Sequence, residues 1–271
     1  MFTSLALGGG GVRGVLHVGG LAALEAHQGH LRFPDGIYGC SIGAVLATAV
    51  AFQLTSTQIK EMMTHHFDVH KFLPQIRLSS IGGVMTSKGA FTMDLFDEGV
   101  LAAFRSQGIE LRGKMIADTP QPLFIGASNI TTHRPVFFTG RVPLLEALRA
   151  SCCLPLVYIP QVVRGNVYLD GGLYMNSLDD FVPPNCLVFH ISHCPQPITP
   201  ANLPDISVSD FLKQLYVGRV HTKERPNRVW FQEDETQILE ELTLEKKVRM
   251  FEIGYSQASA FLAKRTAKKI K

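Results

Sequence analysis

The sequence predicts an α/β fold in which helices cover both faces of a mostly parallel central sheet. Two observations support this prediction. Apolar segments of strand length alternate with apolar segments of helix length from residue 2 to residue 54, and both kinds are hydrophobic almost all round. Such segments are typical of parallel sheets that are covered on both faces. The chain also has 271 residues, 46% hydrophobic and only 18% charged, which suits one large domain with an extensive core.

The first four elements follow this alternation directly. We expect a buried strand over residues 2–7, a helix over 15–26, a second strand over 36–40 and a second buried helix over 41–54. Eleven of the 24 glycines fall within the first 43 residues. Because glycine lets two backbones approach closely, this region is expected to be tightly packed.

Two of these glycines, Gly19 and Gly20, lie inside the first predicted helix, where glycine lowers helix propensity. We expect them to allow that helix to pack closely on the sheet. A histidine of the same helix, His17, is expected to be packed or to lie at the helix end. The spacing of Thr55 and Gln58 predicts a capping box at the start of the next helix.

The rest of the chain continues the alternation less regularly. Helices are expected over residues 55–66, 93–107, 143–150, 207–218 and 240–264, and strands over 122–130, 136–139, 163–169, 187–192 and 228–231. Residues 67–92 hold a proline, several glycines and scattered apolar side chains, and we interpret them as a lid or a surface excursion.

The formal charge of +3 is unevenly distributed. Five basic residues lie in the last eight positions, whereas the rest of the chain has 21 basic and 23 acidic residues. A nucleic-acid-binding protein would show a basic surface throughout, so no nucleic-acid partner is expected. The tail could contact an anionic lipid surface, or it could be a solvated helix end. Its basic residues are Lys264, Arg265, Lys268, Lys269 and Lys271.

An uncharged run of 24 residues, from Gly36 to Ile59, has the length of a membrane span. Polar residues such as Gln53 interrupt it, as do Gly39 and Gly43. A buried strand followed by a buried helix explains the run better, so no transmembrane span is expected. The N-terminus lacks the basic segment that begins a signal peptide.

The spacing of the cysteines and histidines bears on disulfide and metal sites. The five cysteines are Cys40, Cys152, Cys153, Cys186 and Cys194. Their number is odd and no CxxC pair occurs, which argues against a disulfide framework or a zinc site and favours a reducing, cytoplasmic compartment. His65, His66 and His70 cluster near a helix end, but without an HExxH motif we interpret them as exposed helix polarity. We expect no metal.

The first chemical motif, Gly39-Cys40-Ser41-Ile42-Gly43, matches G-x-S-x-G. A predicted strand precedes it and a predicted buried helix follows it, as in the strand–turn–helix setting of a nucleophilic serine. The helix N-terminus behind Ser41 favours developing negative charge. The alternative is an N-capping serine in a tight turn, and the motif alone leaves both interpretations open.

The second motif is the glycine-rich loop formed by Gly9, Gly10, Gly11, Arg13 and Gly14. It fits the dinucleotide pattern G-x-G-x-x-G, but a dinucleotide site also needs an acidic residue at the end of the second strand. That strand ends in Cys40-Ser41 instead. The remaining functional interpretation is a loop of backbone N–H groups that faces the oxyanion of a reaction at Ser41. A non-catalytic nucleotide-binding module stays as an alternative.

The third motif is Asp170-Gly171-Gly172, at the end of the strand predicted over residues 163–169. An aspartate that leaves a parallel strand lies at the edge of the sheet where sites form in α/β proteins. The alternative is an ordinary Asp-Gly turn.

Taken in this order, the three motifs resemble those of the patatin-like family of lipid acyl hydrolases. The approach to the aspartate adds to the resemblance. It includes Ala150-Ser151, Pro155, Pro160 and, after the aspartate, Asn176. The resemblance covers about residues 5–178, with one departure at Cys40, where family patterns often have a small residue.

The resemblance implies a three-layer α/β/α fold and a catalytic dyad, with Ser41 as the nucleophile and Asp170 as its base. It implies that Gly9, Gly10, Gly11 and Arg13 form the oxyanion loop. Its supporting glycines are Gly14, Gly39, Gly43, Gly171 and Gly172.

We therefore expect residues 1–271 to form a single domain, with the motifs over about 5–178 and a basic helix or tail over about 240–271. The implied function is hydrolysis of acyl esters of phospholipids or related lipids at a membrane surface. The implied protein is cytoplasmic, can associate with the membrane as a peripheral protein and needs no cofactor. An enzymatic alternative is a Ser-His-Asp esterase of the α/β-hydrolase type, with His190 or His193 following Ser41 and Asp170 in the chain.

Overall fold

The computed structural model describes residues 1–67, 80–175, 177–192, 198–206, 225–233, 236 and 241–270. Several sequence-based predictions lie outside the described residues. They are the helix over 207–218, His70, Asn176, His193, Cys194 and Lys271.

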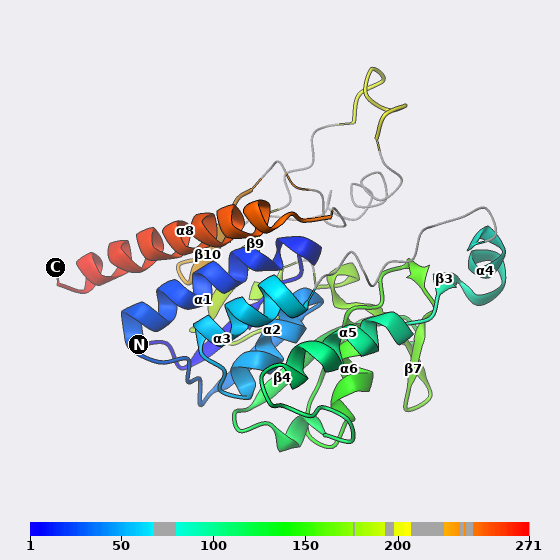
Figure 1. The fold of residues 1–271 in the computed structure, drawn as a ribbon, viewed down its shortest axis with the longest axis horizontal. Coiled ribbons are helices and arrows are strands. Elements are labelled where there is room, and N and C mark those ends of the chain that lie inside the picture. The colour runs from blue at the N-terminus through cyan, green and yellow to red at the C-terminus, as the bar shows by residue number, and fades with distance from the viewer. Residues whose placement is uncertain are drawn as a thin grey trace.

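In the described residues, eight strands form one mixed sheet (Figure 1). Its order is β10 (Arg228–Phe231), β9 (Leu187–Ile191), β1 (Ser4–Leu7), β2 (Gly36–Cys40), β4 (Leu123–Asn129), β8 (Asn166–Asp170) and β7 (Gln161–Val163), with β5 (Arg134–Phe138) also paired to β4. The run from β10 to β4 is parallel, whereas β5, β8 and β7 are antiparallel to their neighbours. The prediction of a mostly parallel sheet is confirmed.

Helices cover both faces of this sheet, as predicted, but unequally. The helices are α1 (Val15–Gln28), α2 (Ile42–Ala51), α3 (Ser56–Glu61), α4 (Ser80–Ser87), α5 (Asp94–Arg105), α6 (Leu144–Ser151) and α8 (Leu244–Ile270). The large core lies between the sheet and α1, α2, α5, α6 and α8. A smaller core on the other face packs under the 3-10 turns η5 (Gly171–Leu173) and η6 (Leu178–Asp180).

The strand alternation explains how one sheet serves two cores. In β1, Leu5 and Leu7 belong to the large core and Ala6 to the small one. Successive side chains of a strand point to opposite faces, so a short strand that is apolar throughout must be covered on both. None of the helices in the described ranges is both long and apolar enough to cross a membrane.

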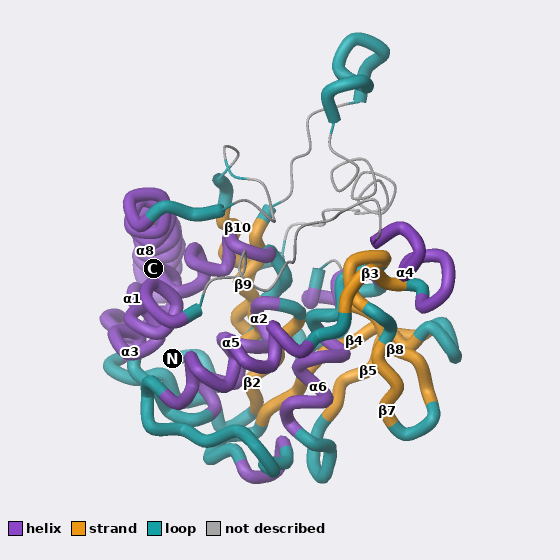
Figure 2. Tube along the Cα trace, turned by 45° about the vertical axis from the view of Figure 1, so that its right-hand side comes forward, coloured by secondary structure: helices purple, strands orange, loops and turns teal. Residues whose placement is uncertain are grey.

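Helices α1 and α8 lie side by side along their lengths (Figures 1 and 2). A Cβ atom on Gly19 would lie 2.0 Å from the Phe251 carbonyl oxygen, and one on Gly254 would lie 2.1 Å from the Leu16 carbonyl oxygen. The two backbones are therefore in direct contact. The expectation that Gly19 packs on the sheet is wrong, because this residue faces α8. Gly20 does face the sheet, where its Cβ would lie 2.5 Å from the Phe231 ring.

The helix predicted over residues 55–66 changes geometry partway. The capping box is present, with the Thr55 hydroxyl accepting the Gln58 N–H, but after α3 the chain forms a π-helical turn over Met62–His66. Lys247 of α8 donates to the carbonyls of Met63 and Thr64 in this turn. The turn therefore joins the N-terminal half of the chain to its last helix.

Between residues 67 and 170, one predicted element needs correction, the strand over 163–169. The described part of 67–92 contains α4 and the short strand β3 (Gly89–Phe91), which pairs with β6 (Leu156–Tyr158). The strand expected over 163–169 is two strands, because Arg164 and Gly165 both have positive φ and form the turn between β7 and β8.

The remaining predicted elements are present with ends shifted by a few residues, apart from α8. That helix begins four residues later than expected and continues to Ile270.

His17 is buried beneath the first βα loop. Its Nε2 lies 2.9 Å from the Gly8 carbonyl oxygen, and its ring packs against Phe189 and Phe231. Burial lowers the pKa of His17 to about 4, despite the opposing effect of the Gly8 hydrogen bond. The ring is therefore neutral near pH 7, and since a carbonyl can only accept, Nε2 carries the proton.

His190 on β9 is buried on the other face of the sheet. Its ring meets the edge of Trp230, beside the buried ion pair between Arg228 and Asp179, whose charged atoms are 2.8 Å apart. Burial and then the Arg228 charge lower the pKa of His190 to about 4.

Replacing Gly19 with alanine is expected to loosen the contact between α1 and α8. The new Cβ would overlap a backbone atom that cannot rotate away, so the free energy of unfolding should fall by about 3 kcal/mol, the upper part of the usual range for overpacking. Urea unfolding measures the loss. Gly82→Ala is the matched control, because nothing lies within 4 Å of its Cβ position in α4. Equal stability of the two variants would contradict the proposed contact.

The two buried histidines are expected to make the fold less stable in acid. Their pKa values are about 4 in the folded chain and about 6.5 in an unfolded one. Between these values the unfolded chain binds more protons, so the free energy of unfolding should fall as the pH is lowered from about 6.5 to about 4. Urea unfolding at a series of pH values measures this slope.

His17→Gln keeps a hydrogen-bond donor for Gly8 but cannot take up a proton, so its slope should be shallower than that of the wild type. His27→Gln, which replaces an exposed histidine of the same helix, is the control and should keep the wild-type slope. A slope unchanged by His17→Gln would mean that His17 does not contribute.

Candidate active site

Ser41 occupies a sharp turn between β2 and α2. Its φ of 55° and ψ of −131° place it in a region that residues with a side chain rarely adopt. The turn is possible because of its glycines. A Cβ atom on Gly43 would lie 2.1 Å from the Leu7 carbonyl oxygen, and one on Gly39 would lie 2.5 Å from the Ala44 Cα. The predicted strand–turn–helix setting is therefore present, with Ser41 at its tip.

Sheet register brings Asp170 to the neighbourhood of Ser41. Cys40 pairs with Gly126 of β4, and Ala127, the next residue of β4, pairs with Asp170 of β8. Ser41 and Asp170 therefore lie on opposite sides of β4, next to the same part of that strand. The expectation that Asp170 leaves a parallel strand is wrong, because β8 runs antiparallel to β4.

The Asp170 carboxyl group is buried and has no cation beside it among the described residues. Its Oδ1 accepts the Gly172 N–H at 2.8 Å, while Oδ2 has no partner of hydrogen-bonding geometry in the described structure. Burial raises the pKa of Asp170 to about 6, and the Ser41 hydroxyl and the Gly172 N–H partly oppose this shift. Ser41 and Asp170 are therefore close enough to interact, and the carboxyl group is ionised near pH 7.

The glycine-rich loop lies against Ser41. A Cβ atom on Gly9 would lie 3.3 Å from the Ser41 Cβ and 4.0 Å from its Oγ. The N–H groups of Gly9, Gly10 and Gly11 donate no hydrogen bond to any described residue. Gly11 has a φ of 58° and begins the 3-10 turn η1 (Gly11–Gly14), where a positive φ favours glycine. The loop thus presents unpaired backbone donors near the serine.

The other predicted residues of this loop fix its position. The Arg13 guanidinium is buried and donates to the carbonyls of Ser192 and Glu233, each at 3.4 Å. These carbonyls follow β9 and β10, so the described contacts of Arg13 tie the loop to these strands. On the other side, a Cβ on Gly14 would lie 2.5 Å from an Ile42 side-chain carbon at the start of α2.

Gly171 accommodates the residue at which this sequence departs from family patterns. Its Cβ would lie 2.6 Å from the Cys40 Sγ and equally close to the Gly126 carbonyl oxygen. Burial raises the pKa of the Cys40 thiol well above its usual range. The thiol is therefore neutral and packs as an apolar side chain. A Cβ on Gly172 would lie 3.0 Å from the Asp170 carboxylate.

The His190 ring packs against Trp230. The Asp170 Oδ1 accepts the Gly172 N–H, and its Oδ2 has no hydrogen-bond partner among the described residues. In the described structure, His190 therefore does not complete a triad. His65 and His66 lie in the π-helical turn, and no group of three side chains in the described ranges could hold a metal ion.

A model of the patatin-like phospholipase family matches residues 5–181. Among curated relatives, a lysophospholipase of the NTE1 type from Cryptococcus neoformans is 31% identical over 179 residues, which are 64% of this chain and 10% of that protein. An uncharacterised protein of Acanthamoeba polyphaga mimivirus is 22% identical and covers 93% of this chain and 90% of its own length. This chain thus spans about a tenth of the lysophospholipase.

Solved structures of low sequence identity share the fold. VipD from Legionella pneumophila superposes with a TM-score of 0.64 at 15% identity, over 97% of this chain and 67% of that one. ExoU from Pseudomonas aeruginosa, solved with SpcU, gives a TM-score of 0.51 at 16% identity, over 97% and 52%. With the family match over more than half of its length, the chain belongs to the patatin-like phospholipase family.

Proposed function

We propose that this chain is a serine acyl hydrolase that cleaves acyl ester bonds of phospholipids or related lipids. The observation that carries the proposal is the placement of Ser41, at a strained turn between a buried carboxylate and a loop of unpaired N–H groups. Ester hydrolysis needs these three parts: a nucleophile, a proton acceptor and donors for the oxyanion.

In the proposed first step, the ionised Asp170 takes the proton of Ser41 as Oγ attacks the ester carbonyl carbon. The negative charge that forms on the carbonyl oxygen is stabilised by N–H groups of Gly9, Gly10 and Gly11. The ester bond breaks, the alcohol leaves with the proton held by Asp170, and the acyl group remains on Ser41.

In the second step, water attacks the acyl-enzyme while Asp170 acts as base again. The carboxylic acid leaves and Ser41 recovers its proton. A pKa of about 6 suits this role, because the carboxyl group is ionised at neutral pH yet more basic than an exposed aspartate.

The lipid substrate rests on the family match and on the relative's description as a lysophospholipase. The two alternatives are less well supported. A Ser-His-Asp esterase would need a histidine beside Asp170, and the His190 ring packs against Trp230 instead. A nucleotide-binding module would not need the strained serine.

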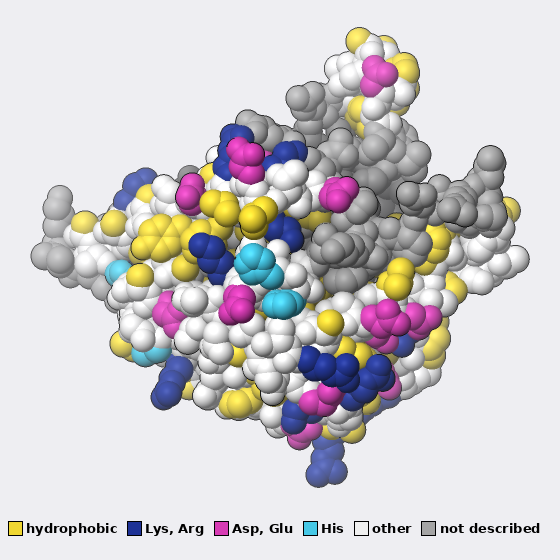
Figure 3. Space-filling model, viewed as in Figure 1, with side chains coloured by type: hydrophobic (Ala, Val, Ile, Leu, Met, Phe, Trp, Pro, Cys, Tyr) yellow, Lys and Arg dark blue, Asp and Glu magenta, His cyan; other side chains and the backbone are white. Residues whose placement is uncertain are grey.

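We also propose that the chain acts at a lipid surface and forms a single domain. Strands β9 and β10 lie outside the motif-bearing segment yet join the same sheet as β1, which supports one domain. At the basic end of α8, Arg265 packs over the Phe2 ring, whereas Lys264 is exposed and available to anionic lipid. On the face seen in Figure 3, basic side chains lie beside acidic ones.

A fluorophosphonate probe tests the class of activity. It should label the wild type at Ser41, and Ser41→Ala should lose both labelling and lipid hydrolysis while keeping its unfolding midpoint. Ser106→Ala, which replaces an exposed serine after α5, is the control and should behave as the wild type. Lipid hydrolysis that survives in Ser41→Ala would disprove the proposed nucleophile.

Asp170→Asn tests the base. An amide cannot accept the Ser41 proton, so kcat should fall by about 10²–10⁴-fold, the usual contribution of a positioned base. In the wild type, kcat/KM should fall below a pH of about 6 as Asp170 becomes protonated. Asp35→Asn, an exposed aspartate, is the control. Turnover that persists in Asp170→Asn but is lost in His193→Ala would favour the triad instead.

A further inference from the structure

We infer that Ser151, the last residue of α6, is a positioning residue that holds Ser41 in its turn and sets its spacing from Asp170. Ser151 is fully buried. Its Oγ accepts the Ser41 N–H at 2.9 Å and donates to the Gly126 carbonyl at 2.6 Å. A hydroxyl has one proton, which Ser151 donates in its hydrogen bond to the Gly126 carbonyl. The lone pairs of the hydroxyl oxygen therefore accept the Ser41 N–H. The inference rests on the proposed function.

The Ser151 hydroxyl lies where direct pairing between two strands ends. Cys40 of β2 is the last residue in register with β4, opposite Gly126. One residue later the chain turns at Ser41, and its N–H is bridged to the Gly126 carbonyl through the Ser151 hydroxyl. A buried N–H without a partner costs about 1–3 kcal/mol. The bridge therefore stabilises the conformation that points Ser41 out of the sheet.

The same segment also holds Asp170. The carbonyl of Cys153 accepts the Asp170 N–H at 2.7 Å, two residues after Ser151. One short piece of chain therefore binds the main chain of both proposed catalytic residues. A movement of this segment would change the distance between the Ser41 hydroxyl and the Asp170 carboxylate.

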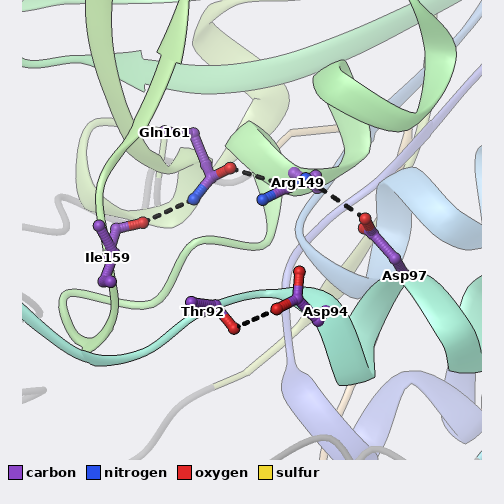
Figure 4. A network of polar contacts seen from close by, with 6 residues as sticks. All are labelled: Thr92, Asp94, Asp97, Arg149, Ile159 and Gln161. Atoms are coloured by element: carbon purple, nitrogen blue, oxygen red, sulfur yellow. Dashed lines mark hydrogen bonds and ion pairs between the residues drawn. The ribbon is translucent and has the colours of Figure 1, made fainter.

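Helix α6 is anchored so that this segment stays in place. Figure 4 shows Arg149 between Gln161 of β7 and Asp97 of α5. Arg149 donates to the Gln161 side chain at 2.9 Å and pairs with Asp97 at 3.3 Å, and Gln161 donates in turn to the Ile159 carbonyl. The last turn of α6 is thus fixed to two further elements.

Ser151→Ala removes the bridge while keeping the Cβ. We expect kcat to fall by about 10- to 100-fold with little change in KM, because the bridge orients groups that react and the Ser151 side chain is fully buried. The rate of fluorophosphonate labelling should fall in parallel. The Ser41 hydroxyl lowers the pKa of Asp170, so a displaced Ser41 should move the acidic limb of kcat/KM to higher pH. Ser151→Thr keeps the hydroxyl and should restore much of kcat.

Thr48→Val is the matched control. It removes another fully buried hydroxyl, from the helix that follows Ser41. Among the described residues, this hydroxyl bonds only the Ala44 carbonyl of its own helix. It should change stability without changing kcat or the pH limb. If Ser151→Ala behaves as Thr48→Val does, Ser151 has a structural role only and the inference is overturned.

If Ser151→Ala does not fold, Arg149→Met is the second variant. It removes the contacts that anchor α6 but keeps the Ser151 hydroxyl. A smaller decrease in kcat with the same shift of the pH limb supports the inference, and unchanged values overturn it. The proposed function is tested separately. Turnover in Ser41→Ala removes both proposals, whereas an inactive Ser41→Ala together with a fully active Ser151→Ala removes only this one.

Discussion

The close approach of two backbones at Gly43 is the constraint on which the site depends. The start of α2 lies so near the end of β1 that a side chain at this position would meet the Leu7 carbonyl oxygen at 2.1 Å. This contact forces the turn at Ser41, and it also places the residues after Leu7 beside that turn. The G-x-S-x-G motif and the glycine-rich loop therefore meet at one backbone contact. Glycines are needed in both because the close approach leaves little room for side chains.

The two buried aspartates near this sheet differ in whether a positive charge lies beside them. Asp179 lies 2.8 Å from Arg228, whereas Asp170 has a serine and a backbone N–H as its neighbours in the described structure. An unpaired buried carboxylate is costly, so such a group is a sign of function more often than of stability. The raised pKa of Asp170 has a consequence for folding: between pH values of about 3.8 and 6 the folded chain holds its proton more tightly, which opposes the effect of the buried histidines.

The sequence was most informative where structure is local. The first strands and helices, the capping box at Thr55 and the turn at Ser41 follow from neighbouring residues, and all are present. The antiparallel pairing of β8 with β4 joins partners about 40 residues apart, so the sequence does not predict the strand direction at Asp170. The sequence does not reveal that Gly19 faces α8, because α1 is apolar almost all round and shows no preferred face. Ser151 belongs to the segment that resembles the family, but a serine at a helix end is common and the sequence does not show which groups its hydroxyl binds.

Both turns of the site are braced by neutral hydrogen bonds from buried serines. Ser151 bridges the Ser41 N–H and the Gly126 carbonyl, and Ser128 in the same way accepts the Tyr174 N–H and donates to the Gly171 carbonyl after Asp170. His17, which binds the Gly8 carbonyl, is neutral as well. Because these supports do not titrate near pH 7, they keep the same geometry while Asp170 gains and loses its proton. Under the proposed mechanism, these supports would let one proton pass between Ser41 and Asp170 without disturbing the backbone that aligns them.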